Sequence, residues 1–340
     1  MRATSLLLFA YSSITNNNNN DATFMQWCSD IGIKCPGAEL RTTSKSVAGR
    51  GVFSTQDLST GDEIISIPYY AALTQENAAE YFPTLASELE QIVMQHNRRS
   101  SSKASYLKRI WNKLRRRKSV HREESETNND DKRWKEELTA YALTALENNH
   151  AWSPWIDQWK RDDPLQTLVD NTNIDDMWSD DEAGFKTSVS DFHEMAPAIP
   201  EYKIGGALWI RLQQLVEYLN LYQNRVPTSG SLYMTLISRA IGLSENVTAV
   251  LPMHDMINHS PSPNVGLVLA EDETIKIVAI KDIPKDEELF MTYFDVIDEE
   301  GEWDEDKATW LLCQWGIPSS PVDTTIQRVE EEAMRVMSKQ

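Results

Sequence analysis

LPMHDMINHS, residues 251–260, sets polar side chains of several kinds in an apolar frame. Asn258 and His259 offer hydrogen-bond donors and acceptors that suit a purine edge or a carboxylate. The histidines of this stretch and Asp255 also suggest a metal site, although no fourth ligand stands at a familiar spacing. A hydrolase dyad that uses Ser260 is a third interpretation, but no GxSxG context accompanies it. The stretch is therefore a candidate ligand site, and the segments around it must decide between these interpretations.

Three further segments carry residues suited to binding or catalysis. AGRGVF, residues 48–53, has two glycines that permit a tight turn and let backbone amides approach a ligand closely. It lacks the full GxGxxG spacing and the following helix of a dinucleotide fold. DIPKDEELFMTY, residues 282–293, is a turn leading into an apolar strand that ends in Tyr293. Ser238-Arg239-Ala240 places one arginine in an otherwise apolar helix. Taken singly, Tyr293 also fits an ordinary strand-end aromatic, and Arg239 a structurally paired arginine.

Between these segments the hydrophobic spacing changes from strands to helices and back again. Helical spacing predicts helices at residues 24–33, 77–96, 134–149, 207–224, 231–241, 306–315 and 324–339. Strands are predicted at residues 52–53, 63–67, 249–252, 265–270, 274–279 and 288–292. Residues 170–191 are acidic and poorly periodic, which predicts loops. A helical insertion that splits one mostly β unit explains this order better than two sequential domains do.

The composition excludes some classes of partner. The chain carries 33 basic and 52 acidic side chains, a formal net charge of −19, which disfavours nucleic acid and anionic membranes. Such a surface tolerates a basic protein substrate. Three scattered cysteines predict neither a zinc site nor a disulfide framework, so a reducing compartment is the default. No stretch has the length of a transmembrane helix. We expect a monomer that binds protein, with no metal.

In their order, the four segments resemble a SET domain of the Rubisco large-subunit lysine methyltransferase branch. The opening of that domain is similar to GRGVF at 49–53, Asp57-Leu58 and Gly61-Asp62-Glu63. Its core motif DxxNHS…PN is similar to DMINHS at 255–260 and Pro263-Asn264-Val265. Its closing segment and end are similar to Asp282-Ile283, Glu287-Glu288-Leu289, Tyr293, Leu311-Leu312 and Trp315-Gly316-Ile317. The long helical insertion and the lack of cysteine-rich flanks also fit this non-histone branch.

The resemblance implies an α+β fold of small β-sheets with a knot-like threading, interrupted by a helical insertion. It implies S-adenosyl-L-methionine as cofactor and methyl transfer to the side-chain amine of a protein lysine. The cofactor residues that it implies are Ala48, Gly49, Arg50 and Gly51 through backbone groups, Asn258 and His259, Arg239 at the cofactor carboxylate, Asp255 in support, and Trp315 stacked on adenine. Tyr293 is implied as the catalytic tyrosine.

The resemblance also divides the chain. The expected parts are a disordered or targeting segment (1–22), an N-terminal SET half (23–76), a helical insertion (77–248) with a basic flexible stretch (98–131), a C-terminal SET half (249–318), and a C-terminal helix (319–340) as the remnant of a substrate-binding domain. The cytoplasm or nucleus is the default location. A plastid location follows if the N-terminal segment is a targeting signal.

Three alternatives stay open. Related proteins use histidine as the acceptor, and the sequence does not choose between lysine and histidine. A catalytically inactive SET-like module that only binds protein fits the short C-terminus. The basic residues between 98 and 122 suggest a nuclear-localisation or nucleic-acid patch, but a solvated, partly helical insertion is favoured because the whole chain is acidic.

Overall fold

The computed structural model describes residues 14–42, 49–95, 133–161, 183–244, 247–270, 274–298 and 302–321. Three predictions fall outside these ranges: the backbone contact of Ala48 with the cofactor, the basic stretch 98–131 and the helix at 324–339. Within the described residues, no helix is long and apolar enough to cross a membrane. No group of three or more His, Cys, Asp or Glu side chains in these residues could hold a metal ion.

The strands form small sheets, as the fold class predicted. They are β1 (Ala38–Thr42), β2 (Arg50–Ser54), β3 (Glu63–Pro68), β4 (Leu73–Thr74), β5 (Ile241–Ser244), β6 (Val247–Val250), β7 (Asn258–His259), β8 (Val265–Leu269), β9 (Thr274–Ala279) and β10 (Phe290–Met291). Their orders are β1-β2, β3-β9-β8, β4-β6-β5 and β10-β7. Strand β9 has the sequence TIKIVA, and its alternate residues are buried, because successive side chains point to opposite faces of a sheet.

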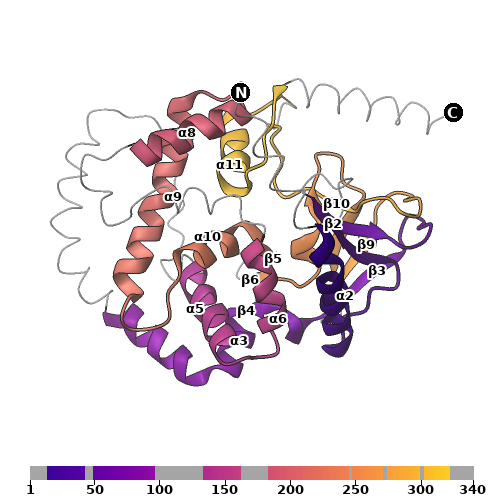
Figure 1. The fold of residues 1–340 in the computed structure, drawn as a ribbon, viewed down its shortest axis with the longest axis horizontal. Helices are drawn as coiled ribbons and strands as arrows, with labels where there is room; N and C mark the ends of the chain where they lie inside the picture. The colour runs from indigo at the N-terminus through magenta and orange to yellow at the C-terminus, as the bar shows by residue number, and fades with distance from the viewer. Residues whose placement is uncertain are drawn as a thin grey trace.

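The helices are α2 (Ile14–Asp30), α3 (Gln75–Tyr81), α5 (Trp134–Glu147), α6 (Ser153–Ile156), α8 (Ala183–Met195), α9 (Glu201–Tyr222), α10 (Gly230–Arg239) and α11 (Glu305–Trp315), with a further helix over 83–95. Single 3₁₀ turns are η1 (Tyr69–Ala71), η3 (Asp157–Arg161) and η5 (His254–Met256). Figure 1 shows α5, α8, α9 and α10 gathered on one side of the molecule, with β2, β3, β9 and β10 on the other and α2 beside them.

Strands from the two ends of the chain pair with one another. In the antiparallel β3–β9 pair, Ile65 faces Ile277, and in the β4–β6 pair Leu73 faces Val250. The Ile65, Ile277, Leu73 and Val250 side chains are completely buried, so their apolar surfaces stabilise the long-range pairing. The helical insertion therefore interrupts one β unit. The exact domain boundaries and the knot-like threading stay predictions.

Tryptophans join the first helix to the insertion. Trp27 of α2 stacks on Trp155 of α6, with ring centroids 6.2 Å apart. Its indole nitrogen donates to the Ala151 carbonyl oxygen at 2.6 Å. Trp155 in turn meets Trp159 edge to face, with centroids 5.1 Å apart. This row of rings leads from α2 toward the stretch 251–260.

Two elements differ from the sequence prediction. Helix α2 begins at Ile14, so residues 14–22 of the segment that was expected to be disordered or a targeting signal, the asparagine run 16–20 among them, lie in a helix. Asparagine has only a modest helix penalty, and a helix that is anchored farther along extends at low cost. Helix α8 covers Ala183–Met195 and so overlaps the end of the region 170–191 that was predicted to be loops; Phe192 and Ser188 are buried on it. Packing against α9 outweighs the weak local periodicity.

Candidate functional site

The polar stretch 251–260 lies beside the strand that leads to Tyr293. Strands β7 and β10 are parallel, with Asn258 opposite Phe290 and His259 opposite Met291. Beyond β7, the side-chain Nδ2 of Asn264 donates to the Glu288 carbonyl oxygen at 2.8 Å. The Phe290 backbone nitrogen donates to Asn264 Oδ1 at 2.7 Å. The buried Asn264 side chain therefore holds its own segment, which follows β7, against the segment that leads into β10.

Asn258 connects this pair to the glycine turn. Its Nδ2 donates to the Arg50 carbonyl oxygen at 2.8 Å and to Glu288 Oε1 at 2.7 Å. Both amide protons are therefore used within the protein, and any ligand contact at this position falls to the backbone or the carbonyl oxygen. Arg50 is likewise engaged through its guanidinium, which pairs with Asp21 at 2.9 Å.

Gly51 lies in the tightest part of this contact. A Cβ built on it would meet Glu288 Oε1 at 2.2 Å and Asn258 Nδ2 at 3.0 Å. We expect Gly51→Ala to destabilise the fold by about 1–3 kcal/mol and to weaken ligand binding at the turn. Urea unfolding measures this change. Gly206→Ala is the matched control, since no described residue lies within 4 Å of that added Cβ on α9. The Gly206 variant should be neutral or slightly stabilising. Equal losses of stability for the two variants would contradict the close contact of Gly51 with Glu288 and Asn258.

A buried ion pair forms the floor of the site. Helix α10 begins at its N-cap Ser229 and ends at Arg239, whose guanidinium Nη1 donates to the Asp255 carbonyl oxygen at 2.7 Å and lies 3.4 Å from Asp255 Oδ2. A cation at a helix C-terminus also benefits from the helix dipole. Trp155 and Trp159 each donate an indole N–H to Asp255 Oδ2 at 2.9 Å. Burial raises the pKa of Asp255, whereas Arg239 and the indole donors favour its ionised form.

Tyr293 lies at the end of this arrangement. Its hydroxyl donates to the Ile257 carbonyl oxygen, and its backbone nitrogen donates to His259 Nδ1 at 3.0 Å. Burial raises the pKa of the Tyr293 hydroxyl well above its ordinary value, so the group stays protonated at neutral pH. His259 therefore holds the backbone of Tyr293, and Ile257 orients its hydroxyl.

Trp315 covers Tyr293 from helix α11. Asp304 caps the start of that helix by accepting from the Asp306 and Lys307 backbone nitrogens, and Gly316, with φ 69°, ends it in the left-handed conformation. The Trp315 indole donates to the Ser238 carbonyl oxygen at 2.7 Å. Its ring centroid lies 6.0 Å from that of Tyr293.

A second contact fastens α11 to α10 beside Trp315. The buried Arg211 of α9 donates to Gln314 Oε1, and Gln314 Nε2 donates to the Ile237 carbonyl oxygen at 3.3 Å. The C-terminal ends of α10 and α11 therefore meet at the site.

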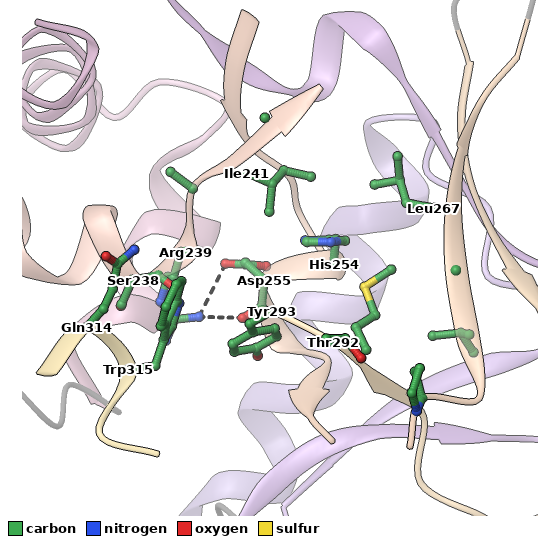
Figure 2. Close-up of a pocket in the computed structure, with 16 residues that line it drawn as sticks. Ser238, Arg239, Ile241, His254, Asp255, Leu267, Thr292, Tyr293, Gln314 and Trp315 are labelled. Atoms are coloured by element: carbon green, nitrogen blue, oxygen red, sulfur yellow. Dashed lines mark hydrogen bonds and ion pairs between the residues drawn. The ribbon is translucent and has the colours of Figure 1, made fainter. Parts of the chain in front are cut away.

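A cavity of about 590 Å³ opens between these groups. Its lining, seen in Figure 2, includes Arg239, Asp255, Tyr293 and Trp315, together with Ser238, Ile241, His254, Leu267, Thr292 and Gln314. Among the other predicted residues that the structure describes, Arg50, Gly51 and Asn258 meet at the β2–β7 contact described above. His259 links the two groups through its bond to Tyr293.

The family model of the SET domain matches residues 49–294. The chain belongs to the SET-domain family. The match runs across the helical insertion, as the order of the motifs predicted.

Solved structures give a weaker likeness to this SET domain. The SET domain of LSMT bound to lysine and AdoHcy has 16% sequence identity and a TM-score of 0.45, over 88% of this chain and 57% of that one. Rubisco LSMT bound to sinefungin and monomethyllysine has 16% identity and a TM-score of 0.47, over 90% and 57%. Rubisco LSMT bound to AdoMet has 16% identity and a TM-score of 0.44, over 88% and 56%. The chain thus spans less than two thirds of the length of these proteins. No curated protein matched the chain.

Several residues of this SET domain that build the site were not among the predicted site residues. Glu288 is buried and joins Asn258 to the glycine turn, and the motif that contains it was the signal that could have found it. The indoles of Trp155 and Trp159 support Asp255 from the insertion, where no motif marks them. His254 lines the cavity, although its position in the stretch 251–260 suggested only a metal ligand.

Two histidines, His254 and His259, should make this SET domain less stable in acid. Burial lowers the pKa of His254 and that of His259 from 6.5 to about 4. The pKa values of both histidines in the folded state lie below the unfolded value. Their contribution to the free energy of unfolding is therefore fully present above pH 6.5, and it is lost as the pH falls from 6.5 to about 4. For His254 this contribution amounts to about 3 kcal/mol.

Urea midpoints measured at pH 7, 6, 5 and 4.5 test this expectation. The variant His254→Phe cannot take up the proton, so its midpoint should fall less steeply over this range than that of the wild type. Parallel pH curves for the two proteins would show that His254 does not couple to folding.

Proposed function

We propose that this SET domain transfers a methyl group from S-adenosyl-L-methionine to the side-chain amine of a protein lysine. One observation carries the proposal. Arg50 and Gly51, Asn258 and His259, and Tyr293 come from distant parts of the sequence, yet they are joined by the Asn258–Arg50 and His259–Tyr293 hydrogen bonds. The family's motifs thereby form one contiguous site beside the cavity, which is what a reaction between two bound molecules requires.

The residues fit such a cofactor. Gly49 has a φ of 77°, and a Cβ on it would meet nothing within 4 Å among the residues that the structure describes, which leaves room for a ligand beside its backbone. Arg239 has a buried Nε with no hydrogen-bond partner among the described residues, which suits a carboxylate. The indole of Trp315 offers an aromatic face. Ala48 would add a backbone contact next to Gly49.

Methyl transfer mainly requires alignment, because the bound cofactor supplies an already activated methyl group. Good alignment contributes roughly 7–11 kcal/mol to lowering a barrier. The lysine must lose its proton before it attacks, and its ordinary pKa is about 10.4. Apolar cavity walls such as Ile241, Leu267 and Met291 disfavour the charged amine and lower that pKa. The Tyr293 hydroxyl and the Ile257 carbonyl oxygen, which are hydrogen-bonded to each other, orient the lysine amine toward the methyl group.

The decisive experiment incubates the purified chain with methyl-labelled cofactor and a cell lysate. Acid hydrolysis of the labelled protein then separates methyl-lysine from methyl-histidine. Methyl-lysine is expected. Labelled methyl-histidine would mean that the chain is a methyltransferase whose acceptor is histidine instead of lysine. An absence of protein-bound label would favour an inactive SET-like module that only binds protein.

Asn258→Ala gives an independent test of the cofactor site. Loss of the two Nδ2 hydrogen bonds frees β2 from β7 and should raise the Kd for S-adenosyl-L-methionine about tenfold, measured by calorimetry. Asn148→Ala is the control, since its exposed side chain caps the end of α5 by donating to the Thr144 carbonyl oxygen, and neither residue lines the cavity. Equal affinities for the Asn258 variant and the control would contradict the proposed cofactor site.

A further inference from the structure

His254 is a polar side chain in the cavity that the proposed mechanism leaves unused. It begins the 3₁₀ turn η5, directly after Met253, whose φ of 68° and ψ of −44° are rare for a residue with a side chain. Strained backbone of this kind persists where the surrounding structure requires it, and it concentrates at functional sites. Here the strained residue is followed at once by a histidine that lines the cavity.

The hydrogen-bonding capacity of His254 is not used up by the protein. The side chain is buried, and its Nδ1 has no hydrogen-bond partner among the described residues. A neutral imidazole carries one donor and one acceptor, and a buried polar group left unsatisfied costs about 1–3 kcal/mol. A ligand that satisfied the ring would recover that free energy.

The surroundings of His254 select the kind of ligand. Figure 2 shows its ring among Ile241, Leu267 and Tyr293, which line the same cavity. The charged groups at this cavity are Arg239 of α10 and Asp255 of η5, and they are paired with one another. Burial keeps His254 neutral at neutral pH, so the imidazole does not repel a cationic side chain. An apolar wall that carries a neutral acceptor fits an aliphatic chain that ends in an N–H donor.

We propose that His254 is a specificity-determining residue, whose imidazole accepts a hydrogen bond from the nitrogen of the acceptor side chain in the cavity. This inference rests on the proposed function and names the group that recognises the amine. His254 moves no proton in the reaction. It holds the nitrogen in line with the Tyr293 end of the cavity, and it distinguishes an amine from an apolar chain of equal length.

The test compares the binding of two small probes by NMR titration, with and without S-adenosyl-L-homocysteine. Nα-acetyl-lysine methylamide carries the terminal nitrogen, and Nα-acetyl-norleucine methylamide has the same aliphatic chain without it. The wild type should bind the lysine probe about tenfold more tightly, a difference of the size that one hydrogen bond supplies.

Two variants decide whether His254 is the origin of this preference. His254→Phe keeps a ring but removes both nitrogens, and it should reduce the preference to about twofold or less. His254→Gln restores an acceptor and should recover part of it. His254→Leu replaces the phenylalanine variant if circular dichroism shows that the latter does not fold. A tenfold preference that survives in the apolar variant, or no preference in the wild type, overturns the proposal.

The same samples separate this inference from the proposed function. Cofactor affinity of the wild type and of His254→Phe is measured by calorimetry, and it should differ by less than about threefold, because the ring is assigned to the acceptor. A wild type that binds no cofactor would sink the proposed function. The probe titration without cofactor would still decide the role of His254.

Discussion

Tyr293→Phe is expected to lower the rate of methyl transfer by about 100-fold or more, while cofactor affinity changes by less than about threefold. The variant keeps the ring that contacts His259 and Trp315, and it loses only the hydroxyl that donates to the Ile257 carbonyl oxygen. Loss of a positioned polar group at a reacting centre typically costs about two to three orders of magnitude in rate. Transfer of labelled methyl to lysate protein measures the rate, and calorimetry measures the affinity.

Tyr70→Phe is the matched control for this experiment. Tyr70 is exposed, and its hydroxyl donates to the Ile31 carbonyl oxygen at 3.1 Å, outside the cavity. Its removal should leave the transfer rate unchanged. If the Tyr293 variant turned over as fast as this control, Tyr293 would have no part in the chemistry.

Asp255→Ala has the largest expected effect on stability, a loss of about 3–5 kcal/mol in the free energy of unfolding. The substitution leaves the guanidinium of Arg239 without its carboxylate, and it orphans the indole N–H groups of Trp155 and Trp159. The side chain of Asp255 is completely buried, so water does not replace these bonds. Urea unfolding measures the loss, and a lowered folded fraction in expression trials should accompany it.

Glu63→Ala is the control, because it removes an ion pair that is exposed to solvent instead of buried. Glu63 and Lys276 lie 2.8 Å apart on β3 and β9, with side chains 39% and 32% exposed. Exposed pairs contribute about 0–1 kcal/mol, so the variant should unfold close to the wild type. Comparable losses in the two variants would mean that burial of the Asp255–Arg239 pair does not govern its contribution.

The sequence motifs predicted which segments build the site, but not how each side chain is used. The stretch 251–260 and Tyr293 were identified from their residue types and order alone. Asn258 was expected at the cofactor, yet its amide protons bind Arg50 and Glu288. Asn and Glu side chains have many possible partners in a folded chain, and only the register of β7 against β10 selects among them.

The contribution of the insertion could not be predicted from its own sequence. Trp155 and Trp159 stand in an ordinary apolar pattern, which fits a core helix as well as a ligand site. They reach Asp255 because α6 and η3 pack beside η5, across about 100 positions of sequence, with separations of 100 and 96 residues. A local pattern carries no information on such a contact, since many packings of the same helices bury equal apolar area.

By itself, the sequence determined the family, the broad order of a strand region, a helical block and a second strand region, and the polar stretch around Asp255. These follow from local features, namely residue type, spacing and turn chemistry. Tertiary structure alone decided that Arg239 pairs with Asp255, that Trp315 covers Tyr293, and that His254 lines the cavity. The reason is physical: burial, ion pairing and lowered pKa values depend on which surfaces exclude water together, and that is a property of the packed chain.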